Sequence, residues 1–235
     1  MSKMKERPGK VLGVLGGMGP AASAEFMRLL SLYAPARLDQ DHPRVVLLSD
    51  PWIPDRSQAI LDKGKDPGPA IRSGLETLLK WGADILAVPC NTAHYFIENF
   101  DRERSLPLVH IVEATMDEVR RSSPGGAWLL ATRGTLKCGI YQHYAETIGY
   151  SLSIPHEQML LKVQDVIHLV KANQLERSGR LLEEVIRYLW KVSEIPVIAA
   201  CTEIPLAYSN SGLPAERMIS SLEALARACI SRLYE

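Results

Sequence analysis

Short apolar runs alternate with longer helical stretches along most of the chain, and this alternation is the strongest constraint on the fold. The first run, Val11–Gly17, breaks at glycines before Pro20 and the helical stretch Ala21–Tyr33. Proline is favoured in the first turn of a helix, so these residues predict a strand, a tight turn and a helix. Further strands are predicted at Val45–Ser49, Asp84–Val88, Leu108–Ile111, Ala127–Ala131, Ser151–Ile154 and Pro196–Ala200. Strands that alternate with helices indicate an α/β fold with parallel sheets flanked by helices.

The chain also carries a weak internal repeat. Ile85–Thr92 and Val197–Glu203 each contain a buried strand that ends in a cysteine, Cys90 or Cys201, followed by a small polar residue. Ligands bind outside the carboxyl ends of parallel strands, so two similar domains facing one another would bring both cysteines to one cleft. Chance similarity between two strand ends is the alternative.

From this repeat we expect two pseudo-symmetric domains, each a parallel sheet flanked by helices, with the active site in the interdomain cleft. The expected first domain comprises residues 1–112 and 207–235, and the second comprises residues 113–206. Helices are also predicted over Thr135–Ile148 and, at the end of the chain, from Met218 to Leu233.

Charge and hydropathy exclude several classes of protein. The 27 Lys and Arg residues equal the 27 Asp and Glu residues, whereas nucleic acids and anionic membranes demand a basic excess. Apolar stretches such as Ile85–Pro89 are far shorter than the roughly 20 residues of a membrane span. Residues Met1 to Lys10 are charged, and glycines break the apolar run that follows, which is a poor signal peptide. We therefore expect a cytoplasmic protein with neither nucleic-acid nor membrane partners.

The four cysteines form no C-x-x-C pair and are expected to be free thiols. A thiol between the end of a strand and the start of a helix lies in a positive field that favours the thiolate. A lone cysteine is most often structural, but two in matching contexts indicate acid–base chemistry. One thiolate can remove a proton from one face of a substrate while the other thiol protonates the opposite face, which inverts the stereocentre.

Five segments then carry a family resemblance: Gly16–Pro20, Ile53–Arg56, Pro89–His94, Ala131–Thr135 and Cys201–Leu206. With these segments in this order, the chain resembles the aspartate/glutamate racemase superfamily. It is most similar to the aspartate racemase branch, whose enzymes work without pyridoxal phosphate. The resemblance implies an isomerase with no cofactor or metal, an amino-acid substrate, and Cys90 with Cys201 as the acid–base pair. We expect a homodimer that racemises aspartate, or glutamate or a broader set of amino acids.

The resemblance also nominates substrate-binding residues. It implies that Asn91, Thr92 and Thr202 bind the α-carboxylate, that Thr132 and Thr135 belong to a substrate-contacting loop, and that Arg56 and Lys171 recognise an acidic side chain. Met18, in the glycine turn, completes the expected set. In one departure, Met218–Ser221 stands where family members often have an aspartate before the last helix.

Other interpretations remain open from sequence. Gly17–Ala22 fits the dinucleotide fingerprint of a dehydrogenase, although Asp50 comes late for its acidic residue. A non-catalytic amino-acid-binding protein would share the cleft, and hydantoin racemases and maleate isomerases use similar cysteines. His94 either polarises the site or packs beside it, and Glu203 either orients Thr202 or caps a helix.

Overall fold

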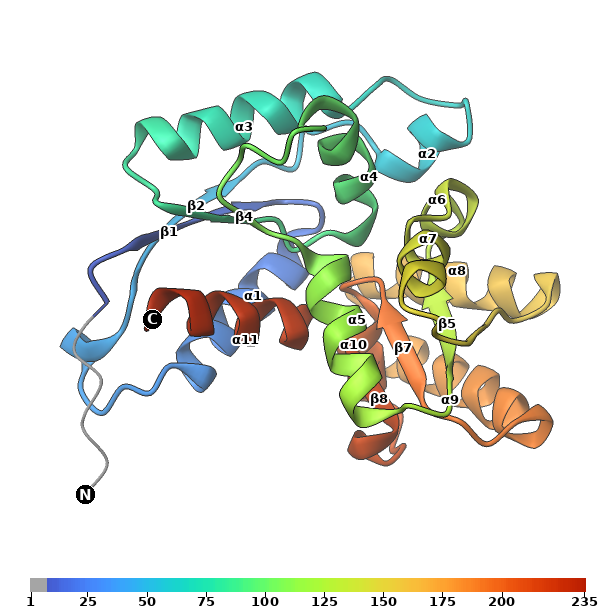
Figure 1. Cartoon of the computed structure of the whole chain (residues 1–235). Helices are drawn as coiled ribbons and strands as arrows, with labels where there is room; N and C mark the ends of the chain where they lie inside the picture. The colour runs from blue at the N-terminus through green and yellow to red at the C-terminus, as the bar shows by residue number, and fades with distance from the viewer. Residues whose placement is uncertain (1–7) are drawn as a thin grey trace.

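The computed structural model describes residues 8–235, and it contains two four-stranded sheets with helices around and between them (Figure 1). Part of the charged segment Met1 to Lys10, and the start of the expected first domain, therefore lie outside the described residues. No helix in the described part of the chain is long and apolar enough to cross a membrane.

The first half of the chain builds one sheet. Its elements are β1 (Val11–Gly16), α1 (Pro20–Tyr33), the 3₁₀ turn η1 (Asp39–Asp41), β2 (Arg44–Ser49), α2 (Arg56–Ile60), α3 (Gly68–Lys80), β3 (Ile85–Ala87), α4 (Asn91–Phe100), β4 (Leu108–Val109) and α5 (Ile111–Ser122). The strands are parallel, in the order β2-β1-β3-β4.

The second half repeats this arrangement. Its elements are β5 (Ala127–Ala131), α6 (Arg133–Cys138), α7 (Ile140–Thr147), β6 (Leu152–Ser153), α8 (Glu157–Lys171), α9 (Leu175–Val192), β7 (Val197–Ala200), α10 (Ile204–Tyr208), η2 (Ala215–Arg217), β8 (Met218–Ser220) and α11 (Ser221–Leu233). These strands are also parallel, in the order β6-β5-β7-β8. The equivalent strand orders confirm the expected fold of two similar α/β halves.

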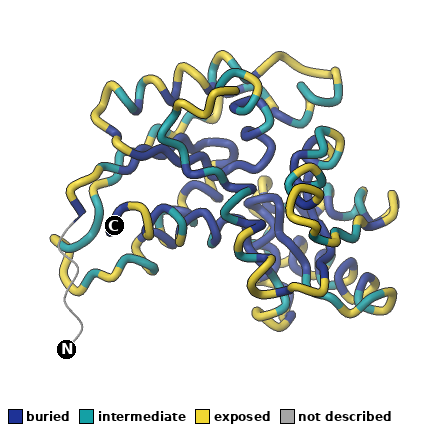
Figure 2. The backbone as a smooth tube through the Cα atoms, viewed as in Figure 1, coloured by how far each residue is buried: buried dark blue, intermediate teal, exposed yellow. Residues whose placement is uncertain are grey.

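A shared apolar core lies between the two sheets. Leu12 and Val14 of β1 and Leu129 of β5 belong to one buried cluster, together with apolar residues of α1, α5 and α11. Alternate side chains point the other way: Leu15 packs with α3 and α4, and Leu130 packs with α8 and α9. Figure 2 shows this concentration of buried backbone in the strands and the helices between the sheets. Each fully buried leucine contributes roughly 1.5–3 kcal/mol to folding, so this core holds the halves together.

The C-terminal segment differs from the predicted one. Met218–Ser220 forms β8 at the edge of the second sheet, where Ile219 is paired with Ile198, so the predicted helical start at Met218 is wrong. The helix begins three residues later, at Ser221, because the Ser220 side chain accepts a hydrogen bond from the Glu223 amide and so forms a regular N-terminal cap. Residues 218–220, expected in the first domain, thus lie in the second sheet, whereas α11 packs against α1. The expected domain boundaries themselves stay a prediction.

The predicted helix Thr135–Ile148 is two helices. Gly139 ends α6 in the left-handed region at φ 69° and starts α7 in a new direction. Glycine adopts this conformation without a steric penalty, which allows the sharp turn.

Candidate active site

A small cavity of about 20 Å³ lies where strands of both sheets end. Its walls come from the turns after β1, β2, β3, β5 and β7 and from the last residue of α8. The lining residues are Met18, Asp55, Arg56, Ser57, Cys90, Asn91, Thr92, Thr132, Lys171, Cys201, Thr202 and Glu203. The structure therefore gathers every site residue expected from sequence except Thr135 around one cavity, which has room for about one water molecule.

Cys90 is placed by the end of β3. It is the residue before α4, has extended backbone angles, and its amide donates to the Val88 carbonyl over 2.7 Å. The next residue, Asn91, is held from behind: Tyr141 donates to Asn91 Oδ1 over 2.6 Å, and Asn91 Nδ2 donates to Ser221 Oγ over 2.9 Å. The Ser221 hydroxyl, in the first turn of α11, thus supports Asn91.

Three threonine hydroxyls join the two halves beside the cavity. Thr92 on α4 lies 3.2 Å from Thr132 and 2.8 Å from Thr135, and the last two are 3.0 Å apart. Thr132 also caps α6 by accepting from the Thr135 amide. Thr135 is fully buried and does not line the cavity, and its hydroxyl is in hydrogen-bond contact with those of Thr92 and Thr132.

Cys201 lies beside a buried carboxylate. Its Sγ donates to Oε2 of Glu203 over 3.0 Å, and the Thr202 hydroxyl donates to the same oxygen over 3.3 Å. Burial raises the pKa of the Cys201 thiol well above its usual value, Glu203 raises it further, and Lys171 opposes the rise. The Cys201 thiol is therefore held protonated, whereas its place between a strand and a helix predicts a thiolate; burial and the Glu203 charge outweigh the field of the short helix α10. Glu203 makes no capping bond to α10, so its side chain orients Cys201 and Thr202.

Arg56 and Glu203 are the only Lys, Arg, Asp or Glu side chains that are buried within residues 8–235, and both line the cavity. The Arg56 guanidinium donates to the Ile53 and Pro54 carbonyls over 3.0 Å and to the Met18 carbonyl over 3.2 Å. Its Nε, and Oε1 of Glu203, are buried without a hydrogen-bond partner among the described residues. The site thus offers one free donor and one free acceptor of opposite charge.

Two glycines allow neighbouring backbone segments in the walls of the cavity to approach each other closely. Gly17 has φ 91°, and a Cβ there would lie 2.4 Å from the Asp50 carbonyl carbon. A Cβ on Gly134 would lie 2.7 Å from Cα of Ser57, which brings α6 of the second half against α2 of the first. Both contacts involve backbone, which cannot give way cheaply, so a larger residue would displace a wall of the cavity.

Lys171 is exposed at the end of α8. It lines the cavity and also lines a second, more open pocket of about 570 Å³. Asp55, Arg56 and Glu203 also line both spaces. These side chains therefore separate the inner cavity from an outer pocket beside the start of α1.

The remaining expectations concern cysteines and metal ligands. All four cysteines are free; Cys229 is fully buried in the shared core, and Cys138 donates to the Thr135 carbonyl over 3.3 Å. Within residues 8–235, no cluster of three or more His, Cys, Asp or Glu side chains is arranged to hold a metal ion.

Three lining residues were absent from the predicted set: Asp55, Ser57 and Glu203. Asp55 accepts from the Gln58 amide over 2.7 Å and so caps α2, which carries Arg56. The sequence contained a signal for each, because Asp55 and Ser57 flank Arg56 and Glu203 follows the second cysteine by two residues.

Comparison with known proteins defines the class. The family model for Asp/Glu/Hydantoin racemases matches residues 15–229. The chain belongs to the Asp/Glu/Hydantoin racemase family, whose racemases are isomerases. Family membership favours the racemase interpretation of the glycine turn over the dinucleotide-binding one.

Individual relatives include amino-acid racemases. The chain is 29% identical over 230 residues to the broad specificity amino-acid racemase RacX of Bacillus subtilis (strain 168), covering 94% of this chain and 97% of that one. It is 32% identical to the aspartate racemase of Picrophilus torridus, with a TM-score of 0.84 and coverage of 96% and 94%. An aspartate racemase homologue from Pyrococcus horikoshii OT3 shares the fold at 21% identity and a TM-score of 0.72, over 96% and 100% of the two chains.

Proposed function

We propose that this protein interconverts the L and D enantiomers of aspartate by proton transfer between two cysteines, without a cofactor. The observation that carries the proposal is that Cys90 and Cys201 line the same cavity as the two buried charged residues, Arg56 and Glu203. The relatives named above support an amino-acid substrate. Glutamate, or the broader specificity named for the Bacillus relative, is the alternative substrate range.

The charges of the cavity suit a zwitterionic amino acid with an acidic side chain. The free Nε of Arg56, beside Nη2, offers a planar pair of donors to a carboxylate. The free Oε1 of Glu203 offers an acceptor for the α-ammonium group. The start of α4, at Asn91 and Thr92, stabilises negative charge and is the proposed seat of the α-carboxylate.

The proposed chemistry needs one thiolate and one thiol at a time. In one direction the thiolate of one cysteine removes the α-proton, and the thiol of the other delivers a proton to the opposite face. Burial and Glu203 keep Cys201 protonated, which supports its role as the proton donor in the direction where Cys90 is the base. The hydroxyls and the first amides of α4 would stabilise the negative charge that develops on the carboxylate during proton removal.

A substrate larger than water requires the site to open. The inner cavity holds about 20 Å³, and the outer pocket that shares Arg56, Lys171 and Glu203 with it holds about 570 Å³. We propose that the substrate enters from this outer pocket and that the walls close over it, which excludes water from the reacting carbon.

The direct test is a racemisation assay over a panel of L and D amino acids, without added cofactor, followed by chiral chromatography. Aspartate is expected to be racemised fastest in both directions. Turnover of neutral amino acids in preference to aspartate and glutamate would contradict the assignment of Arg56 to an acidic side chain. Binding of amino acids without any racemisation would instead identify a binding protein.

A further inference from the structure

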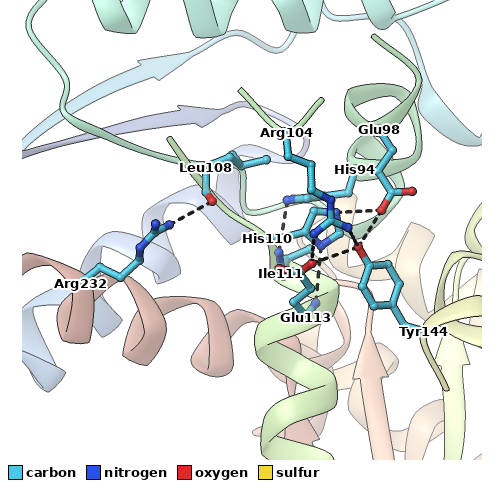
Figure 3. Close-up of polar contacts among 9 residues, drawn as sticks. All are labelled: His94, Glu98, Arg104, Leu108, His110, Ile111, Glu113, Tyr144 and Arg232. Carbon is cyan, nitrogen blue, oxygen red and sulfur yellow. Dashed lines mark hydrogen bonds and ion pairs between the residues drawn. The ribbon is translucent and has the colours of Figure 1, made fainter. Parts of the chain in front are cut away.

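A histidine one helical turn after the first cysteine is fully buried beside the site but does not line its cavity. His94 Nδ1 lies 2.9 Å from the carbonyl oxygen of Cys90. Its Nε2 lies 3.3 Å from the amide nitrogen of Ile111, the first residue of α5, and this second contact is drawn in Figure 3. A carbonyl oxygen only accepts hydrogen bonds and an amide N–H only donates them. The two contacts therefore fix one neutral tautomer, with the proton on Nδ1 and the lone pair on Nε2.

Charged and titratable groups surround His94 on several elements. The ring of His110, just before α5, meets the His94 ring edge-on at 4.5 Å between centroids. His110 Nε2 lies 3.2 Å from Oε1 of Glu98 on α4, and its ring stacks on Tyr144 of α7. Tyr144 in turn contacts Glu98 and Glu113, and Arg104 binds Glu113 and Tyr144 (Figure 3).

These surroundings keep the ring neutral. Burial lowers the pKa of His94 well below its usual value and His110 lowers it further, whereas hydrogen bonding to the backbone of Cys90 and Val109 opposes them only in part. A protonated ring would also lose the hydrogen bond that Nε2 accepts from the Ile111 amide. His94 therefore cannot serve as a proton donor to the site in this arrangement.

We propose that His94 is a positioning residue for Cys90. The peptide between Cys90 and Asn91 is planar, so a ring that holds the Cys90 carbonyl also sets the direction of the Asn91 amide. It thereby fixes the orientation of the Cα that bears the thiol. The other ring nitrogen accepts a hydrogen bond from α5, which packs against α7, α11 and β8. The position of the Cys90 thiol is therefore tied to the position of the helices between the two sheets.

The inference rests on the proposed function, since a positioned thiol matters only if it performs chemistry. The tautomer and the exposure of the thiol can nevertheless be measured without any substrate. Two substitutions separate the ring's contacts. In His94→Asn the amide nitrogen lies near the position of Nδ1 and can still donate to Cys90, whereas in His94→Gln the longer amide reaches the position of Nε2 and keeps the contact with Ile111.

Activity and thiol reactivity are then measured in both variants. His94→Gln is expected to lower kcat at least tenfold with little change in KM, whereas His94→Asn should retain at least a third of the kcat. Cys90 is buried in the wild-type protein. If its carbonyl loses the hydrogen bond from residue 94, its backbone should move more freely and expose the thiol to the reagent. Its alkylation by iodoacetamide, followed by peptide mass spectrometry, should rise at least threefold relative to Cys201 in His94→Gln only. The exposed His156, changed to Asn and to Gln, is the matched control and should leave all readouts unchanged.

The ring state is read directly by ¹⁵N NMR of the histidine-labelled wild-type protein. The His94 ring should carry its proton on Nδ1 and stay neutral from pH 8 to pH 5.5. A doubly protonated ring near pH 6 would overturn the proposal, and so would equal losses in the two variants that follow their melting temperatures. If the protein racemises no amino acid, the NMR and alkylation results still decide whether His94 positions Cys90, and the proposed function alone fails.

Discussion

Arg56 and Glu203 show how individual side chains define the site. A buried polar group without a partner costs about 1–3 kcal/mol, so proteins rarely retain one without a use. Here a donor on the cation and an acceptor on the carboxylate are both left without a partner, on two residues that line the same cavity. Recovery of this cost on binding a zwitterion would favour the substrate over water.

Substitution of Arg56 by lysine tests the geometry of carboxylate recognition. Lysine keeps the charge but cannot present two parallel donors or bridge the Met18, Ile53 and Pro54 carbonyls. We expect kcat/KM for aspartate to fall about 10- to 100-fold, as for one lost charge-assisted hydrogen bond of roughly 1.5–3 kcal/mol. The exposed Arg44→Lys is the control. Unimpaired activity of Arg56→Lys on acidic substrates would remove Arg56 from the binding site.

The pH dependence of Cys201 reactivity tests the role of Glu203. The carboxylate opposes ionisation of the thiol, so Glu203→Gln should lower the pKa of Cys201, although burial still holds it above the usual value. The pH profile of Cys201 alkylation should shift to lower pH, with faster alkylation at any fixed pH below the midpoint. The exposed Glu146→Gln should not shift the profile. A shift to higher pH would show that Glu203 does not act on the thiol by its charge.

The internal repeat predicts that Cys90 and Cys201 converge, and the family resemblance nominates Arg56, but neither decides the role of Glu203. Cys-Thr-Glu is followed by Ile204 and Pro205, which begin a helix, so capping by Glu203 was a reasonable alternative. The carboxylate turns toward Cys201 instead because the thiol and Thr202 both donate to it. Such a contact depends on side-chain direction, which spacing alone does not determine.

At the scale of elements, the apolar runs predicted the strands well because buried parallel strands need continuous apolar sequence. The apolar residues of Met218–Ser220 adjoin a helical pattern and so predict a helix, yet Ser220, followed three residues later by Glu223, also matches the capping signal of a helix that starts after it. The apolar pattern does not predict the break at Gly139, because helical periodicity continues on both sides. The approach of α2 to α6 is a contact between halves and has no local sequence signal other than Gly134.

Replacement of Gly134 by alanine tests that approach. The added Cβ would overlap Cα and Cβ of Ser57, beside Arg56 on α2 and Thr132 before α6. Overpacking of this kind costs about 1–3 kcal/mol, so the free energy of unfolding in urea should fall by that amount and KM for aspartate should rise. Gly125→Ala is a matched control, since its added Cβ meets nothing within 4 Å. Equal effects of the two substitutions would contradict a role for the α2–α6 contact.

At the scale of the whole molecule, two similar sheets share a layer of helices, and their strand ends meet at one small cavity. Cys90 and Cys201 are 7% and 6% exposed, so both thiols are enclosed together. The pseudo-symmetry explains why the repeat in the sequence predicted their convergence: equivalent strands β3 and β7 occupy equivalent places in the two sheets.

Because both thiols line one enclosed cavity, a bound substrate should protect both of them from alkylation. Aspartate should slow alkylation of Cys90 and Cys201 together, because both line the closed cavity that the substrate would occupy. Cys229 provides an internal control: it is fully buried in the core, burial raises its pKa, and it should stay unmodified until the protein unfolds. Protection of Cys90 without Cys201, or of Cys201 without Cys90, in a mass-spectrometric time course would show that the two thiols do not share one substrate.

The pairing of the two thiols is tested most directly by α-hydrogen exchange in heavy water, followed by NMR for both enantiomers of aspartate. Cys90→Ser and Cys201→Ser should each lower racemisation in both directions by about 10²–10⁴-fold, because in the proposed mechanism each thiol is the base in one direction and the acid in the other. Each variant should retain slow exchange of one enantiomer only, and the two variants should retain opposite ones. A single variant that still racemises near the wild-type rate would show that one base suffices and would contradict the two-cysteine mechanism.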